Sequence, residues 1–422
     1  MADAVPDSVT GAPARSGLAP VVHRAATFTR PAQSQSRRWA PSPRTSWLAS
    51  LSAAAVPWAV ARFVVLSALV FARQLVHLLH LADPAVLGKA HQGLLSWDAG
   101  WYAGIASRGY GALSRDALRF FPLMPMVARG LHEILPLSTR ACLVVVANAC
   151  ALVAGVLLHQ LVVRESGDGA LARRATWLMA LAPPAYVLVM GYSEALAIAL
   201  AIAAFLALRR RRWWWAAAWG VLAGLARPLM VLLVVPAVVE VARAARDRGL
   251  DSASVVRRAR AGMGRLAAVA SAPAGAAAYM AWVGARFGDA LLPVRIQQQR
   301  RHRGRLELPT HVLARAVGDV AHGRHLGQAL HLPWVALLCA LVVVAARRWP
   351  PSFAAYAGAV LALSLCSANL DSLERYALGA FPFVLAGASS TESPRLEGAV
   401  MAVAAMAMGG YAVLAFLNLV VP

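Results

Sequence analysis

The sequence predicts an all-α protein whose helices cross a membrane several times. Hydrophobic residues make up 59% of the 422 residues and charged residues only 14%, whereas soluble proteins carry about a quarter charged residues. The apolar residues gather in runs that are long enough to cross a bilayer. Arginines fall in short clusters between these runs, as is typical of cytoplasmic loops. The net charge of +22 therefore indicates no nucleic-acid partner, and the expected partner is the membrane lipid bilayer.

The first 45 residues differ in composition from the rest of the chain. Residues 1–45 are rich in Ala, Pro, Ser and Arg and have no periodic apolar pattern, so we expect a disordered tail. Its arginines favour the cytoplasmic side, and the segment is too long and too polar for the n-region of a secretory signal. Residues 46–422 are expected to form one transmembrane domain in the cell membrane.

This domain contains about eleven apolar segments that we expect to cross the membrane, with a first external loop at about residues 82–140. Residues 213–243 are broken by Arg227-Pro228, and both flanks are basic. Because Pro interrupts a helix and both flanks are expected inside, we interpret them as two short segments hinged at Arg227. The expected segments are 51–81, 141–163, 175–190, 194–209, the two parts of 213–243, 266–283, 332–346, 354–367, 376–388 and 400–420.

Within the first external loop, one stretch combines a carboxylate with many aromatic side chains. Residues 97–125 read WDAGWYAGIASRGYGALSRDALRFFPLMP. In a helix, Trp97 and Trp101 share one face, and Asp98 and Tyr102 share the neighbouring face. This pattern is typical of an interfacial helix, because Trp and Tyr lie at the level of the lipid headgroups. The alternative is an amphipathic connector in which Asp98 only caps the first turn.

Charged residues that are unusual in or beside apolar segments all reach the extracytoplasmic side in this topology. They are Asp98, Glu194, Arg227, the Arg-rich residues 295–303, Asp371, Glu374 and Arg375. Acids and bases in a partly dry cavity are costly, so they usually bind or react with something. The acids suit a general base, and the arginines suit a phosphate by charge and by bidentate geometry.

Each of these residues also has a structural interpretation, which the sequence leaves open. Glu194 suits the first turn of a helix, and Arg227 suits an ion pair that only stabilises the fold. The Arg-rich residues 295–303 suit a solvated face or lipid headgroups. Glu374 and Arg375 suit a surface ion pair of small energetic value.

Nothing in the sequence indicates a cofactor or a bound metal. The four cysteines lie inside apolar segments, without metal-ligand spacing or a disulfide framework. They are Cys142, Cys150, Cys339 and Cys366. Buried Cys behaves as a small hydrophobic residue, and we find no Gly-rich phosphate loop of the kind that binds nucleotides.

Several motifs follow one another in the order expected for a known family. They are Trp97-Asp98, Trp101-Tyr102, Ile105-Ala106, Gly109-Tyr110, Phe120-Phe121-Pro122-Leu123 with Pro125, Tyr192-Ser193-Glu194, Gly224 with Arg227, Glu374-Arg375-Tyr376 and Phe381-Pro382. From about residue 50 onward, the chain resembles the PIG-V-like mannosyltransferases, which are integral membrane glycosyltransferases of the GT-C type. The composition, rich in Arg and Ala, suggests an actinobacterial member. The chain departs from the family pattern at Met124 and at Pro228-Leu229.

The resemblance implies an inverting transfer of mannose from a polyprenyl-phosphate-mannose donor to an acceptor hydroxyl on the extracytoplasmic side. Asp98 is then the general base, with Glu194 orienting it or the acceptor. Because Arg can neutralise the leaving phosphate, no metal is required. The expected phosphate-binding residues are Arg227, Arg375, Arg300, Arg301 and His302. The expected substrate-positioning residues are Trp97, Trp101, Tyr102, Tyr110, Phe121, Tyr192, Glu374 and Tyr376. The acceptor is an unidentified glycan, glycolipid or protein, and a partner subunit is left open.

Two other classes of membrane protein were weighed. A lipid or solute transporter, or a flippase, explains an interrupted helix and buried charges, but it should show paired broken segments and polar groups at both faces. A scaffold protein explains the apolar segments but leaves Asp98 and Arg227 without a purpose. The acids gathered on one side favour the transferase.

Overall fold

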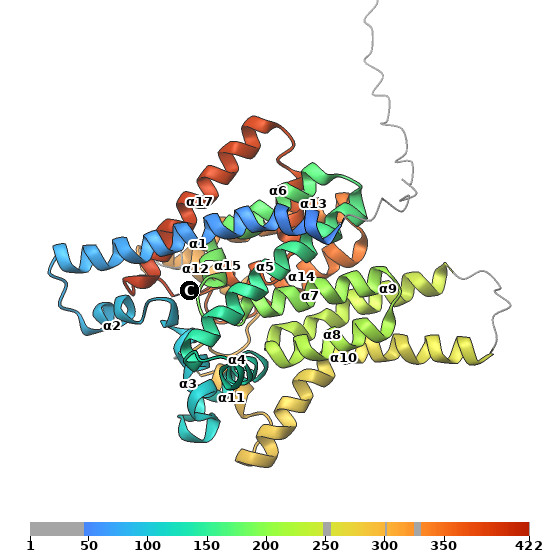
Figure 1. Ribbon diagram of the computed structural model, residues 1–422, viewed down its shortest axis with the longest axis horizontal. Helices are drawn as coiled ribbons and strands as arrows, with labels where there is room; N and C mark the ends of the chain where they lie inside the picture. Colours follow the sequence, from blue (N-terminus) through green and yellow to red (C-terminus); the bar gives the residue numbers. More distant parts are fainter. Residues whose placement is uncertain (1–45, 248–254, 300–301, 325–330, 422) are drawn as a thin grey trace, which may run out of the picture. The chain divides into compact units, whose positions relative to one another are not determined.

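The computed structural model describes residues 46–247, 255–299, 302–324 and 331–421 (Figure 1). The tail expected to be disordered, residues 1–45, lies outside the described residues, as do Arg300 and Arg301. The described residues are almost entirely helical and contain no strand, apart from an isolated antiparallel bridge between Leu306 and Ser367. The prediction of an all-α protein is therefore confirmed for the part of the chain that the structure describes.

Helices of very different length make up the fold. The α-helices are α1 (Trp47–Leu78), α2 (Pro84–Gln92), α3 (Asp98–Arg108), α4 (Leu123–Ile134), α5 (Thr139–Ser166), α6 (Gly169–Leu181), α7 (Glu194–Arg209), α8 (Trp213–Ala226), α9 (Val234–Arg246), α10 (Val255–Phe287), α11 (Leu292–Gln297), α12 (Pro309–Ala321), α13 (Leu332–Arg348), α14 (Pro351–Leu365), α15 (Leu373–Leu378), α16 (Pro382–Ser389) and α17 (Pro394–Phe416). Short 3₁₀ segments are η1 (Gly93–Leu95), η2 (Tyr110–Ala112), η3 (Arg115–Arg119), η4 (Pro183–Leu188) and η5 (Pro228–Leu233).

Among the described residues, five helical stretches are long and apolar enough to cross a membrane, so the protein is a multi-pass membrane protein. They are Trp47–Leu78, Thr139–Ser166, Pro228–Arg246, Arg260–Phe287 and Pro394–Phe416. A helix needs about 20 residues to span the hydrocarbon core, and the other expected segments form shorter helices. The count of eleven spans is therefore not confirmed.

Helix α1 shows how the sequence suits a lipid environment. Small residues such as Ala61 and Ala72 are buried against neighbouring helices, whereas Phe63 and Val70 remain exposed. Small residues let helix backbones approach closely inside a membrane bundle. Large apolar side chains on the outer face are compatible with lipid and unfavourable in water.

The expected hinge at Arg227 is present. Helix α8 ends at Ala226, and Arg227 adopts an extended backbone (φ −158°, ψ 146°) before Pro228 begins η5. The residue before a proline is driven out of the helical region by the ring of that proline, so this break follows from local sequence. The segment expected at 376–388 is also broken, because α15 ends at Leu378 and α16 begins with Pro382.

Close packing of α8 against α10 fixes the position of this hinge (Figure 1). A Cβ atom on Gly224 would collide with the backbone carbonyl of Ala272, and one on Gly275 would collide with that of Val221. The two helices therefore touch through their backbones, as small residues allow. Arg227 lies three residues after Gly224, so the contact between the two helices fixes its position.

Candidate active site

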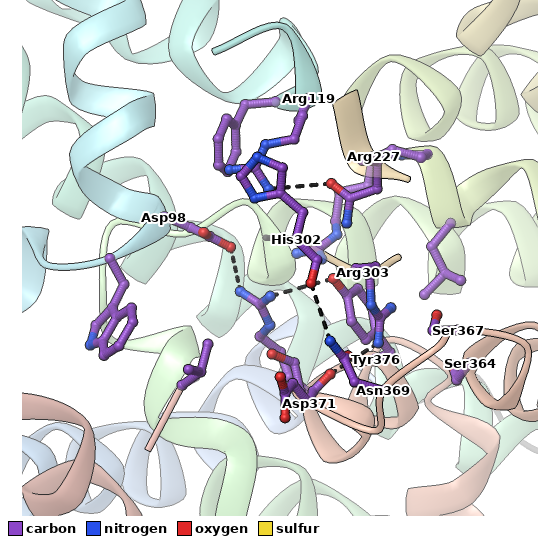
Figure 2. Close-up of a pocket in the computed structure, with 18 of the residues that line it drawn as sticks. Asp98, Arg119, Arg227, His302, Arg303, Ser364, Ser367, Asn369, Asp371 and Tyr376 are labelled. Carbon is purple, nitrogen blue, oxygen red and sulfur yellow. Dashed lines mark hydrogen bonds and ion pairs between the residues drawn. The ribbon is translucent and has the colours of Figure 1, made fainter. Parts of the chain in front are cut away.

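A cavity of about 540 Å³ lies where segments far apart in the chain converge. Its walls come from the start of α3, the hinge between α8 and η5, Gln297 with the segment from 302 to 306, α14 and the segment from 367 to 376. The expected site residues that line it are Trp97, Asp98, Trp101, Tyr102, Arg227, His302, Arg375 and Tyr376. Figure 2 shows Asp98 on one side of the cavity, with Arg303 and Tyr376 on the other.

Asp98 is the first residue of α3, and the residue before it has an unusual backbone. Trp97 has φ +58° and ψ −129°, a region that is essentially reserved for glycine and costs a side-chain-bearing residue roughly 1–3 kcal/mol. The Trp97 indole donates to the carbonyl oxygen of Ala415 in α17 at 2.9 Å. The backbone N–H of Asp98 donates to the hydroxyl oxygen of Tyr192 at 3.3 Å. These contacts hold the carboxylate at the cavity wall.

Arg375 forms an ion pair with Asp98, with 2.5 Å between Nη1 and Oδ2. The Arg375 side chain is 8% exposed and that of Asp98 is 32% exposed. Burial by itself raises the pKa of Asp98, but the positive charge of Arg375, aided by Arg119 and Arg227, brings this pKa below its ordinary value. Asp98 is therefore an ionised acceptor of hydrogen bonds at neutral pH.

Glu194 lies behind the cavity wall and does not line it. It is the first residue of α7, its side chain is 2% exposed, and it forms an ion pair with Arg227. Its Oε1 also lies 3.6 Å from Nε of Arg375. A buried carboxylate between two guanidinium groups holds both in place, since an unpaired charge at this depth would be costly. Its place at a helix N-terminus adds to this stability.

Three guanidinium groups surround the ring of Tyr376. The distances from Cζ to the ring centre are 4.0 Å for Arg303, 5.3 Å for Arg375 and 5.7 Å for Arg227. Arg303 also donates to the backbone carbonyl of Asp371 at 2.9 Å. Guanidinium groups that converge on one side of a cavity form a strong site for a phosphate.

Several expected residues lie outside the cavity. Tyr110 and Phe121 pack in an aromatic cluster against Tyr279 of α10, at centre-to-centre distances of 5.8 and 4.7 Å. Tyr192 lies behind Asp98 and does not line the cavity. Glu374 is buried, and its carboxylate contacts Nδ1 of His331 at 2.7 Å.

His302 does line the cavity, with its Nε2 3.6 Å from Asp116.

Lys89, Arg119, Gln297 and Asn369 also line the cavity but belong to none of the recognised motifs. Arg119 donates to the side-chain oxygen of Gln297 at 3.3 Å, and Asn369 donates to the backbone carbonyl of His302 at 3.2 Å. Arg119 lies within the stretch 97–125 and Gln297 within the Arg-rich residues 295–303, whereas Lys89 is notable in the sequence only as the single lysine of the chain. Within the described ranges, no group of His, Cys, Asp or Glu side chains has the geometry of a metal site.

The fold and this cavity define a multi-pass membrane protein with a charged, partly buried pocket. A family model described as mannosyltransferase (PIG-V) matches residues 68–243. This segment contains Asp98, Glu194 and Arg227 but ends before Arg375. Among curated proteins and solved structures, nothing matches the chain significantly. The family match supports a mannosyltransferase function and agrees with the resemblance seen in the motifs.

Proposed function

We propose that the protein transfers mannose from a polyprenyl-phosphate-mannose donor to an acceptor hydroxyl, with inversion at the anomeric carbon. The observation that carries this proposal is the joint presence, in one cavity, of the Asp98 carboxylate and of three guanidinium groups around Tyr376. The carboxylate suits the role of a general base, and the guanidinium groups suit the stabilisation of a leaving phosphate. A lipid-linked donor requires no nucleotide site.

In this reaction, the acceptor oxygen forms a bond to the anomeric carbon while the bond from that carbon to the phosphate oxygen breaks. Asp98 takes the proton of the acceptor hydroxyl, and the polyprenyl phosphate leaves with the bonding electron pair. Arg227, Arg303 and Arg375 stabilise the charge that develops on the phosphate. Attack from the face opposite the leaving group inverts the configuration of the sugar.

The other expected residues take supporting roles in this proposal. Glu194 positions Arg227 and Arg375 through its ion pairs with both. Trp101 and Tyr102 line the cavity beside Asp98 and supply aromatic surface for the sugar. The hydroxyl of Tyr102 contacts that of Ser193 at 2.7 Å, which fixes its ring.

An apolar side of the cavity suits the lipid chain of the donor. Pro228, Leu229, Leu306 and Leu363 line it, and Leu306 and Leu363 remain substantially exposed. Exposed apolar residues beside a site for a phosphate match an amphiphile with a charged head and a hydrocarbon tail. This supports a lipid-linked donor over a soluble sugar nucleotide.

The position of the cavity along α7 supports an extracytoplasmic active site. Glu194, beside the cavity, begins α7, and Arg209, followed by further arginines, ends it. Arg209 pairs there with Glu165 and Glu240. Because Arg-rich loops favour the cytoplasm, the opposite end of α7 with the cavity is assigned to the outside. No feature of the described residues favours the transporter or the scaffold.

The test is sugar transfer by the purified protein in nanodiscs, with radiolabelled polyprenyl-phosphate mannose and a membrane extract as the source of acceptor. Asp98→Asn should abolish transfer, because the amide cannot accept the proton. The matched control is Asp289→Asn, which changes a carboxylate that does not line the cavity and should leave transfer unchanged. Full turnover by Asp98→Asn would remove Asp98 from catalysis, and no turnover by the wild type would contradict the transferase proposal.

A further inference from the structure

An arginine lies in the interior of a helix that is long and apolar enough to cross the membrane. Arg62 stands at the middle of α1 and is partly buried against α5 and the end of η4. In the described part of the chain, no carboxylate forms an ion pair with it. Because an ionisable residue inside a membrane is costly, it usually serves a function, and its partners indicate which one.

The hydrogen bonds of Arg62 go to neutral oxygen atoms on three segments. Its Nε donates to the side-chain oxygen of Asn148 in α5 at 2.8 Å, and its Nη1 donates to the carbonyl oxygen of Trp58 in α1 at 3.1 Å. Its Nη2 donates to the carbonyl oxygen of Leu188, the last residue of η4, at 3.2 Å. The guanidinium carbon also lies 4.5 Å from the centre of the Trp58 ring. The planar guanidinium therefore joins α1 and α5 to the end of η4.

The segment that receives these donors is not helical. Between η4 and α7, residues 188–194 form a turn, named here the 188–194 turn. In the described backbone, no N–H donates to the carbonyl oxygens of Leu188 and Val189. Side chains supply the missing donors, because Arg62 donates to Leu188 and Nδ2 of Asn148 donates to Val189 at 3.0 Å. Buried non-helical backbone in a membrane protein requires such partners, since an unsatisfied carbonyl is costly there.

The 188–194 turn also holds both halves of the proposed site. The hydroxyl oxygen of Tyr192 accepts from the backbone N–H of Asp98 at 3.3 Å. Glu194 forms an ion pair with Arg227, and its Oε1 lies 3.6 Å from Nε of Arg375. Because the turn is short and its side chains are buried, a displacement at its start reaches Tyr192 and Glu194.

We propose that Arg62 and Asn148 are positioning residues for the transfer reaction, because they fix the 188–194 turn that holds Asp98 and the arginines of the phosphate site. This inference rests on the proposed function and extends the site to two residues that touch no substrate. A misplacement of about 1 Å can lower a rate roughly 100-fold. A purely structural role would instead lower stability and leave the kinetics of the folded protein unchanged.

The first test compares Arg62→Met with Arg174→Met in the transfer assay. Arg174 is also buried and donates to a backbone carbonyl, that of Ala388 in α16, at 3.4 Å, so it is the matched control for general destabilisation. We expect kcat to fall roughly tenfold or more in Arg62→Met and to keep its wild-type value in Arg174→Met. Arg62→Lys, which retains a donor for the Leu188 carbonyl, should recover most of the rate. Equal kcat values for the two Met variants would overturn the inference.

The pH profile separates positioning from stability. Glu194 holds Arg375, and the charge of Arg375 keeps the pKa of Asp98 below its ordinary value. A displaced turn weakens this effect, so the acid limb of kcat/KM should move to higher pH in Arg62→Met and stay in place in Arg174→Met.

Asn148→Leu provides a second variant that leaves Arg62 in place, should Arg62→Met fail to fold. It removes the donor to the Val189 carbonyl and should move the acid limb in the same direction. An acid limb that stays at its wild-type position in the folded variants would contradict the positioning role.

A last test does not depend on transfer. Hydrogen exchange in nanodiscs, read by mass spectrometry, should become faster in Arg62→Met at the 188–194 turn and at residues 373–378, and stay unchanged in the other helices. Faster exchange throughout the protein, or unchanged exchange at the turn, would overturn the inference. If the wild type transfers no sugar, the transferase proposal fails, and the exchange still decides whether Arg62 holds the turn.

Discussion

Arg375 reaches Asp98 from 277 residues further along the chain and forms an ion pair with it, 2.5 Å from Nη1 to Oδ2. The same guanidinium lies 3.5 Å from the hydroxyl of Tyr376 and near Glu194. It therefore touches both the proposed base and the proposed phosphate site. A phosphate bound at Tyr376 competes with Asp98 for Arg375, and release of Asp98 from this ion pair makes it a stronger base.

The pH dependence of transfer should report this ion pair. The pKa of Asp98 lies below its ordinary value, so the ionised base persists as the pH falls and is lost only below about pH 4. In Arg375→Gln, burial still raises the pKa and the main opposing charge is gone. The acid limb of kcat/KM, which reports the free enzyme, should therefore move to higher pH. An unmoved limb would show that Asp98 does not control this limb.

The same ion pair contributes to stability in a defined pH range. Since the folded-state pKa of Asp98 is depressed, its contribution is present above the ordinary carboxyl pKa of about 3.9 and is lost as the pH falls through the lower folded-state value. Thermal unfolding in detergent at decreasing pH should show this loss in the wild type and a smaller one in Asp98→Asn.

Glu194→Gln should destabilise the fold by roughly 3 kcal/mol, because it leaves two buried guanidinium groups without their shared carboxylate. The control is Asp247→Asn, which breaks the solvent-exposed pair with Arg211 and should cost at most about 1 kcal/mol. Thermal unfolding of both variants in the same detergent makes the comparison. Equal small effects would mean that Glu194 does not position the two arginines.

Arg303→Gln should raise the donor KM roughly tenfold, since one charge-assisted contact to the phosphate is lost. Arg295→Gln provides the matched control, because Arg295 belongs to the same Arg-rich connection but is exposed and pairs with Asp289. The measurement is donor KM at saturating acceptor. If both variants change it equally, the effect comes from general surface charge and not from the site around Tyr376.

Gly224→Ala should raise the donor KM, although Gly224 does not line the cavity. A Cβ at this position collides with the backbone of α10 at Ala272 and displaces the end of α8, which Arg227 follows. Gly262→Ala serves as control, since the same change in α10 meets open space. We expect a lower unfolding temperature and a higher donor KM for Gly224→Ala alone. A wild-type donor KM would show that the hinge position does not depend on this packing.

Part of this site follows from local patterns. The hinge at Arg227 could be predicted because Pro228 disfavours a helical conformation in the residue before it. Asp98 and Tyr102 could be expected on one helical face from their spacing, and both line the cavity. The all-α fold follows from the apolar runs. These features depend on interactions between residues that are close along the chain.

The remaining features depend on which helices pack together. Glu374 and Arg375 are adjacent, yet one contacts His331 and the other Asp98, because consecutive helical residues point in different directions. Tyr110 and Phe121 belong to the same stretch as Asp98, residues 97–125, but pack against Tyr279.

Lys89 and Arg119 belong to no recognised motif and reach the cavity only because distant segments converge there. Such contacts are decided by the packing of the whole bundle, since the burial of one helix face depends on the shape and charge of every neighbour. The amino-acid order therefore indicates the chemistry of the site, and the tertiary structure decides which residues supply it.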